Sequence, residues 1–137
     1  MNLMTDPQRS IRIKQFKRHI NYVFGLCKDH YGLSKYQDGY PDLVLETDTE
    51  DIMGGYYDHD LNEMQINYQG FDDSKECYEY YFKLVTHEFI HYHQSPIWFK
   101  RYYKMGHDYL SHPYEIEAYG REDELLNAIH GRYTDTI

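Results

Sequence analysis

The stretch that decides the fold reads Tyr78-Glu79-Tyr80-Tyr81-Phe82-Lys83-Leu84-Val85-Thr86-His87-Glu88-Phe89-Ile90-His91. Its apolar residues recur at steps of three and four, which places them on one face of a helix. Asp73 or Ser74 can cap the start of this helix, and Pro96 cannot continue it. We therefore predict a helix that begins near Ser74 and ends before Pro96.

The centre of this helix carries the motif HExxH, formed by His87, Glu88 and His91. Residues i and i+4 share one helix face, so the imidazoles of His87 and His91 can converge on one metal ion. Glu88 is rotated by about 100° from His87, where it reaches a water on the metal rather than the metal itself. That position suits a general base. The motif predicts a zinc site with His87 and His91 as ligands and Glu88 as the base.

A catalytic zinc takes three protein ligands, so one more must come from elsewhere in the chain. The long metzincin form would place a third histidine at position 97, where this chain has Ile97, and that form is excluded. The last predicted helix offers side chains for this role in the segment from His112 to Gly120, which includes Glu115 and Glu117. Residues two apart on a helix point in different directions, so only one of the two can face the metal.

An HExxH helix followed by a helix with the sequence ExEA resembles the gluzincin-like arrangement. The resemblance is closest to small minimal zincins, including the ImmA/IrrE-type peptidases and short phage-encoded metallopeptidases. It implies that the Glu directly before Ala, here Glu117, is the third ligand, with Glu115 as the alternative. The continuation Tyr119-Gly120 departs from the ImmA/IrrE pattern. The resemblance also implies that Glu63–Tyr68 is an edge strand that pairs with an extended peptide substrate.

Outside this pair of helices, the patterns predict an α+β fold. A periodic apolar face indicates an N-terminal helix, and alternation with turn residues near Asp58 to Asn62 indicates a small three-stranded sheet with a hairpin. Together with the HExxH helix and the C-terminal Glu-bearing helix, this order looks zincin-like and forms a single domain over residues 1–137. The expected elements are a helix Asp6–Tyr31, strands within Pro41–Thr47, Gly54–Asp58 and Glu63–Tyr68, a loop Ser95–Ser111, and a helix Tyr114–His130 closed by Gly131.

The composition of the chain excludes several classes of partner. Its 137 residues carry a formal net charge of −9, which argues against nucleic acid as the main partner. The one basic cluster, residues 9–18, falls on the first predicted helix and is interpreted as a solvated face. No apolar run is long enough for a membrane span, and no secretory signal opens the chain. Cys27 and Cys77 form no disulfide framework, so we expect a reducing compartment: cytoplasmic, or virion-associated if the protein is phage-encoded.

The other histidines and the tyrosines offer secondary roles. His93 should point away from the metal, and His19, His30, His59 and His130 are interpreted as surface residues. A donor for the oxyanion formed during hydrolysis could come from His107, His112, Tyr109, Tyr114 or Tyr119. The 17 tyrosines themselves have no explanation in the sequence.

These patterns predict a zinc-dependent peptidase in which Glu88 deprotonates a metal-activated water that attacks a peptide bond. The expected partner is a peptide or protein substrate, with possible association with a larger assembly. The alternative is a catalytically weak or inactive zinc-binding module, structural or virion-associated. A DNA-associated peptidase of the SprT type would need a basic surface and often a Cys-rich zinc ribbon, and the sequence has neither.

Overall fold

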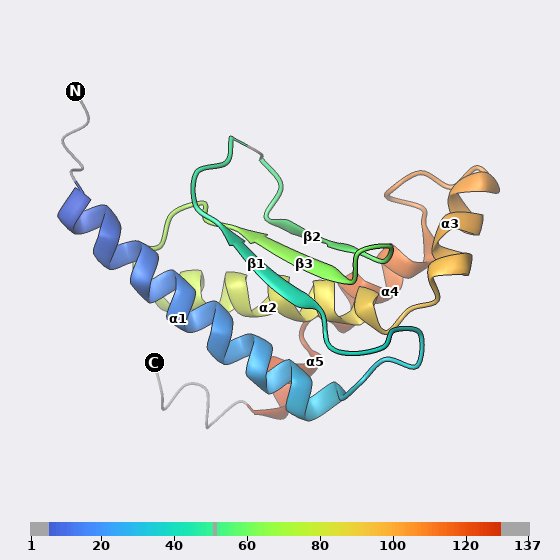
Figure 1. The fold of residues 1–137 in the computed structure, drawn as a ribbon, viewed down its shortest axis with the longest axis horizontal. Coiled ribbons are helices and arrows are strands. Elements are labelled where there is room, and N and C mark those ends of the chain that lie inside the picture. Colours follow the sequence, from blue (N-terminus) through green and yellow to red (C-terminus); the bar gives the residue numbers. More distant parts are fainter. Residues whose placement is uncertain (1–5, 51, 130–137) are drawn as a thin grey trace.

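The computed structural model describes residues 6–50 and 52–129, and it has the predicted α+β class (Figure 1). The first helix and the three strands lie where the sequence patterns place them. The elements in chain order are α1 (Asp6–Tyr31), β1 (Asp42–Glu46), β2 (Gly55–Asp58), β3 (Glu63–Asn67), α2 (Lys75–Tyr92), α3 (Pro96–Lys104), α4 (Pro113–Arg121) and α5 (Glu124–Ala128).

The three strands form a mixed sheet in the order β1-β3-β2. Strand β3 pairs in parallel with β1 and antiparallel with β2, and Glu63 opposes both Asp42 and Asp58. The β2–β3 hairpin confirms the predicted turn. Because β3 has a neighbour on each side, the expectation that Glu63–Tyr68 is an edge strand is wrong. The edge strand nearest the HExxH helix is β2, which contacts α2.

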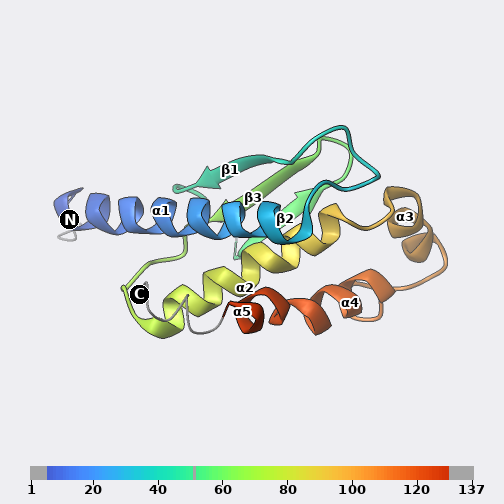
Figure 2. The ribbon, with the colours of Figure 1, turned by 90° about the horizontal axis from the view of Figure 1, so that it is seen from below.

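Helix α2 begins after Ser74, whose side chain accepts a hydrogen bond from the backbone N–H of Cys77. The second half of the helix, from Val85 to Tyr92, is buried throughout, since α2 is covered on several sides. It packs against α1, β2 and β3, α4 and α5. Figure 2 shows α2 between the sheet and the α4–α5 segment, with α1 alongside. A helix that is buried all round can hold polar side chains only where they have partners.

The hydrophobic core lies where α1 and α2 meet the sheet. Fully buried side chains of three elements meet there: Phe16, Ile20 and Val23 of α1, Phe82, Val85 and Phe89 of α2, and Met64 and Ile66 of β3. The apolar faces predicted for α1 and α2 are therefore the faces that make the core. Within residues 6–50 and 52–129, no helix has the length and hydropathy needed to cross a membrane.

The segment between α2 and α4 corrects the sequence prediction of a loop from Ser95 to Ser111. Ser95 accepts a hydrogen bond from the N–H of Trp98, and Pro96 occupies the first turn of α3. Proline is well tolerated there because the N–H that it lacks has no partner inside the helix. The Ser-Pro pair thus ends one helix and starts the next, whereas the sequence pattern predicts only the first role.

The last predicted helix is also corrected, because it is divided. Helix α4 ends at Arg121, and α5 begins at Glu124. The break lets Glu122 reach His87 and lets Asp123 form an ion pair with Lys83 at 3.1 Å. These contacts are made with α2, so local sequence patterns do not report them. His130 and Gly131, the predicted end of the helix, lie outside the described residues.

Candidate metal centre

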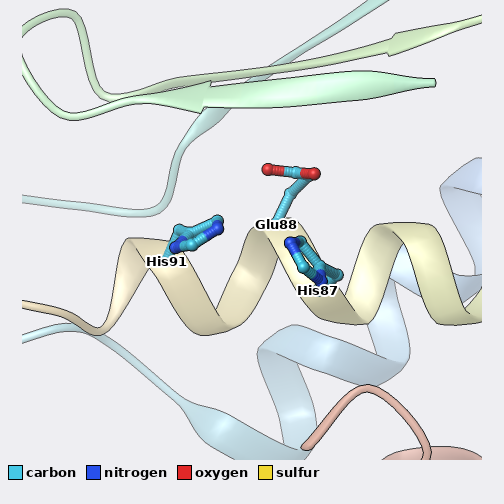
Figure 3. A group of neighbouring side chains, drawn as sticks. All are labelled: His87, Glu88 and His91. Atoms are coloured by element: carbon cyan, nitrogen blue, oxygen red, sulfur yellow. The ribbon is translucent and has the colours of Figure 1, made fainter. Parts of the chain in front are cut away.

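The two histidines of the motif lie one turn apart on α2 and are both buried. Their ring centroids are 4.9 Å apart and the ring planes are nearly perpendicular. One ligand atom from each of His87, Glu88 and His91 lies within 4.8 Å of the other two, which makes the group a candidate metal site (Figure 3). The convergence predicted from the i, i+4 spacing is present.

Glu115 brings a carboxylate from α4 to this pair. Its Oε1 lies 3.2 Å from Nε2 of His87 and 2.8 Å from Nε2 of His91, and the side chain is buried. Burial alone would raise the pKa of Glu115, but its hydrogen bonds to the two imidazoles outweigh this and lower the pKa to about 2. Two imidazole nitrogens and one carboxylate oxygen meeting at a point form a donor set suited to zinc.

Glu117, the ligand implied by the family resemblance, does not reach the histidine pair. Its carboxylate accepts a hydrogen bond from Nε2 of Gln94 at 2.7 Å and pairs with Arg121 at 3.2 Å. The two acids point in different directions, as their spacing predicts, and the one that faces the histidines is Glu115. The geometry therefore favours the alternative of the two sequence candidates.

The Nδ1 atom of each imidazole contacts a second side chain. Nδ1 of His87 contacts Glu122 at 3.1 Å, and Nδ1 of His91 contacts Oε1 of Gln94 at 2.6 Å. Such contacts orient metal-binding histidines and leave Nε2 free to coordinate. Sequence reasoning missed both residues. Gln94 follows His91 by three positions, a helical spacing that could have indicated it, whereas Glu122 depends on the break after α4.

The side chain of Glu88 extends from α2 toward the sheet (Figure 3). Its carboxylate accepts a hydrogen bond from the backbone N–H of Tyr57 in β2. Burial raises the pKa of Glu88, while the two imidazoles and the Tyr57 N–H act in the opposite direction. A buried carboxylate with a raised pKa beside a metal site is suited to accept and return a proton.

A cavity of about 580 Å³ opens beside His87 and Glu88. One wall is the middle of α2, and the other is the chain leading into β2; Tyr109, Tyr119 and Glu122 complete it. The Tyr109 and Tyr119 hydroxyls are 3.1 Å apart, and the Tyr119 ring lies 4.5 Å from that of His87 between centroids. The volume is in the usual range for ligand sites.

The other histidines differ from one another in their surroundings. His112 is fully buried: its Nε2 donates to the carbonyl of Phe99, and its Nδ1 accepts from the N–H of Tyr114, which caps α4. His93 donates to the carbonyl of Gly32, in line with its predicted direction away from the metal. His30 is exposed as predicted.

Two histidines interpreted as surface residues are buried, His19 as a whole and His59 at its ring nitrogens. His19 is buried and donates to the carbonyl of Tyr78. Both ring nitrogens of His59 are buried, and neither has a hydrogen-bond partner among the described residues. Burial, and for His59 also the nearby His91, lowers the pKa of each to about 4. Neither position has a sequence pattern that would indicate burial of an imidazole.

The site therefore combines three potential metal ligands, a buried carboxylate beside them and an adjoining cavity. Their arrangement can hold a divalent cation and place a base next to it. No protein-family model, curated protein or solved structure matches the chain, and we argue its function from this geometry.

Proposed function

We propose that the protein is a zinc-dependent peptidase with a zincin-like fold, in which His87, His91 and Glu115 hold the metal. The donor set fits zinc because both Nε2 atoms face the Glu115 carboxylate while both Nδ1 atoms are engaged elsewhere. Zinc bound there would lower the pKa of a coordinated water and polarise a substrate carbonyl.

The position of Glu88 is the observation that carries the proposal. A purely structural zinc site needs no buried carboxylate beside its ligands, since it is closed by its four ligands. Here Glu88 adjoins both the histidine pair and the cavity, and its pKa is raised by burial. Glu88 takes the proton of the attacking water and passes it to the leaving amine.

Strand β2 supplies the surface for an extended peptide. The Asn67 N–H donates to the Gly54 carbonyl across the hairpin, so by alternation Gly55 and Tyr57 turn their backbone groups away from β3. Both residues therefore face the open edge of the sheet, next to α2. The Tyr57 N–H is engaged by Glu88, so a peptide that pairs with Gly55 and with the Tyr57 carbonyl would run past Glu88, which is the mode of β-strand addition.

Among the sequence candidates for oxyanion donor, Tyr109 and Tyr119 have the best position. His112 uses both ring nitrogens in the fold, and His107 contacts Ser111. Tyr109 and Tyr119 instead line the cavity together with His87 and Glu88, and their hydroxyls contact each other. Burial, then the contact with Tyr119, raises the pKa of Tyr109, so its hydroxyl keeps the proton that a donor must offer.

The test is the variant Glu88→Gln, assayed with zinc on a denatured protein and a peptide library. The amide cannot accept the water proton, so we expect zinc to stay bound while cleavage falls by at least about a hundredfold, the usual scale of general base catalysis. Zinc content is measured by metal analysis and cleavage by mass spectrometry. Cleavage by Glu88→Gln at the wild-type rate would refute the mechanism. Zinc binding by the wild type without turnover would favour the inactive module.

A further inference from the structure

The amide of Gln94 is held in one orientation by its neighbours. Its Nε2 donates to the carbonyl oxygen of Tyr114 at 3.0 Å, an atom that can only accept, and to Oε1 of Glu117 at 2.7 Å. The opposite orientation would place the amide oxygen against two acceptors. Oε1 of Gln94 therefore faces His91, at 2.6 Å from Nδ1.

This orientation determines which nitrogen of His91 carries the proton. An amide oxygen cannot donate, so Nδ1 of His91 must be the N–H of that contact. Without a metal, the Glu115 carboxylate also draws a proton to Nε2; when a metal takes that place, the neutral imidazole keeps its one N–H on Nδ1 and offers the lone pair of Nε2. Nε2 is the atom that points at Glu115, toward the candidate metal position. The carboxylate of Glu117 thus acts on Nε2 of His91 through the amide of Gln94.

The two imidazoles differ in what supports them. His87 contacts the carboxylate of Glu122 directly, whereas His91 contacts a neutral amide. Glu117 binds that amide, and the charge of its carboxylate is partly neutralised by Arg121, which also binds Glu124. Hydrogen bonds in series polarise one another, so the Glu117 carboxylate strengthens Oε1 of Gln94 as an acceptor.

We propose that Gln94 and Glu117 are positioning residues that fix the tautomer and direction of His91, and that neither binds the metal. The proposal rests on the metal-binding part of the proposed function and is independent of catalysis. The two acids of the ExE segment in α4 then have different roles. Glu115 contacts the two imidazoles, and Glu117 binds the amide of Gln94, which in turn contacts His91.

Zinc affinity tests the proposal with Glu117→Leu, Glu117→Gln and Gln94→Leu, measured by chelator competition. We expect Gln94→Leu and Glu117→Leu to weaken zinc binding by about 10- to 100-fold, the scale of outer-shell changes. Glu117→Gln keeps an oxygen that can accept from Gln94, so it should stay within roughly threefold of the wild type. Glu124→Gln is the matched control, because it removes an acid from Arg121 without touching Gln94.

The tautomer of His91 is a second readout that needs no metal. The comparison is made in the Glu115→Leu background, where no carboxylate draws the proton to Nε2. In that metal-free protein at mildly alkaline pH, ¹⁵N NMR should show the proton of His91 on Nδ1, both with Gln94 and Glu117 unchanged and with Glu117→Gln. Gln94→Leu should move a substantial part of it to Nε2. Circular dichroism and thermal melting of the metal-free variants show whether each one folds.

The outcomes separate the two claims. Unchanged zinc affinity together with an unchanged tautomer in Gln94→Leu would overturn the positioning role. A loss of zinc affinity in Glu117→Gln as large as that in Glu117→Leu would overturn it too, because it would indicate that Glu117 is a direct ligand. If the wild type binds no zinc, the proposed function fails, and the tautomer measurement alone then decides the role of Gln94.

Discussion

The two acids of the α4 segment have opposite environments although only one residue separates them. Glu115 is buried between two imidazoles, and Glu117 is half-exposed beside Arg121. A carboxylate that is surrounded by metal-binding nitrogens depends on the metal or on protons for its charge balance. A carboxylate that has an arginine partner does not.

Replacing Glu115 by Gln should therefore affect zinc binding more strongly than any change at Glu117. We expect Glu115→Gln to weaken zinc binding by roughly 100-fold or more, beyond the ~10- to 100-fold typical of residues outside the coordination shell. Chelator competition on both glutamine variants measures the difference. A weaker effect at position 115 than at position 117 would return the ligand role to Glu117.

A second effect at this scale concerns acid sensitivity, because His19 has a pKa of about 4 in the fold against 6.5 in the unfolded chain. The unfolded state takes up the proton first, so the contribution of His19 is complete above pH 6.5 and is lost as the pH falls toward 4. Between about pH 7.5 and pH 5 the wild type should lose ~2 kcal/mol more stability than His19→Gln.

The glutamine can still donate to the carbonyl of Tyr78, which keeps the contact and removes the titration. Denaturant unfolding of both proteins at the two pH values, with chelator present throughout, gives the difference without a contribution from metal release. Parallel losses in the two proteins would show that His19 is not responsible.

The residues that could be predicted are those whose geometry is local. The convergence of His87 and His91 and the separate direction of Glu88 follow from helix periodicity, and so does the rule that only one of Glu115 and Glu117 faces the histidine pair. Which of the two does so depends on the rotation of α4 against α2, and that rotation is set by tertiary packing. The same holds for Glu122 and for the burial of His19.

At the scale of elements, the approach of β2 to its neighbours depends on glycine. A Cβ atom at Gly55 would overlap the backbone oxygen of Gln65 in β3, and a Cβ at Gly54 would meet the side chains of Leu84 and Tyr80 of α2. The edge strand can therefore lie close to both β3 and α2 only because these two side chains are absent. Strand alternation predicts β2 but not this closeness.

Gly55→Ala should consequently destabilise the protein by about 1–3 kcal/mol, the usual cost of forcing atoms into a packed site. Gly25→Ala is the control, because the residue is inside α1 and, apart from the adjoining backbone of that helix, nothing lies within 4 Å of the added Cβ. That change should stabilise by roughly 0.5–1 kcal/mol through better helix propensity. Chemical denaturation compares the two, and equal effects would contradict the close packing of β2.

The elements themselves were predictable to different degrees. Long periodic segments such as α1 and α2 were found because their apolar faces repeat over several turns. Helix α3 was missed because it has no buried residue, and periodicity in apolar residues reports burial. The pairing order of the strands was missed because β1 and β3, which are distant in sequence, are neighbours in the sheet.

Across the whole molecule, tyrosine hydroxyls connect helices and strands to loops and, at Tyr31, α1 to α5. Each contributes an aromatic ring for burial and a polar end that can reach a backbone or side-chain group, which suits a small domain with long connections. The hydroxyl contacts include those from Tyr31 to Glu124, Tyr40 to Lys28, Tyr57 to Asn62, Tyr78 to Asp73, Tyr80 to Gln69, Tyr81 to Gly70 and Tyr92 to Gly39. Composition alone could register the excess of tyrosine but not this use.

Tyr92 shows the effect most clearly, because its hydroxyl donates to the Gly39 carbonyl and accepts from the N–H of the buried Ser34. Tyr92→Phe leaves both groups without that partner, so we expect a loss of about 1–3 kcal/mol in the free energy of unfolding. Tyr22→Phe, on the exposed side of α1, should change it by less than about 0.5 kcal/mol. Similar values for the two variants would refute the connecting role.

Helix α3 stands at one end of the molecule, and it carries the single tryptophan of the chain (Figure 1). Trp98 is 44% exposed and lies under Arg101, while its neighbour Phe99 packs against the rings of His91 and His112. Tryptophan fluorescence of the unmodified protein therefore originates from one helix that adjoins the histidine site. Its emission maximum and its quenching provide a label-free optical signal for movement of α3 when zinc or a peptide is added.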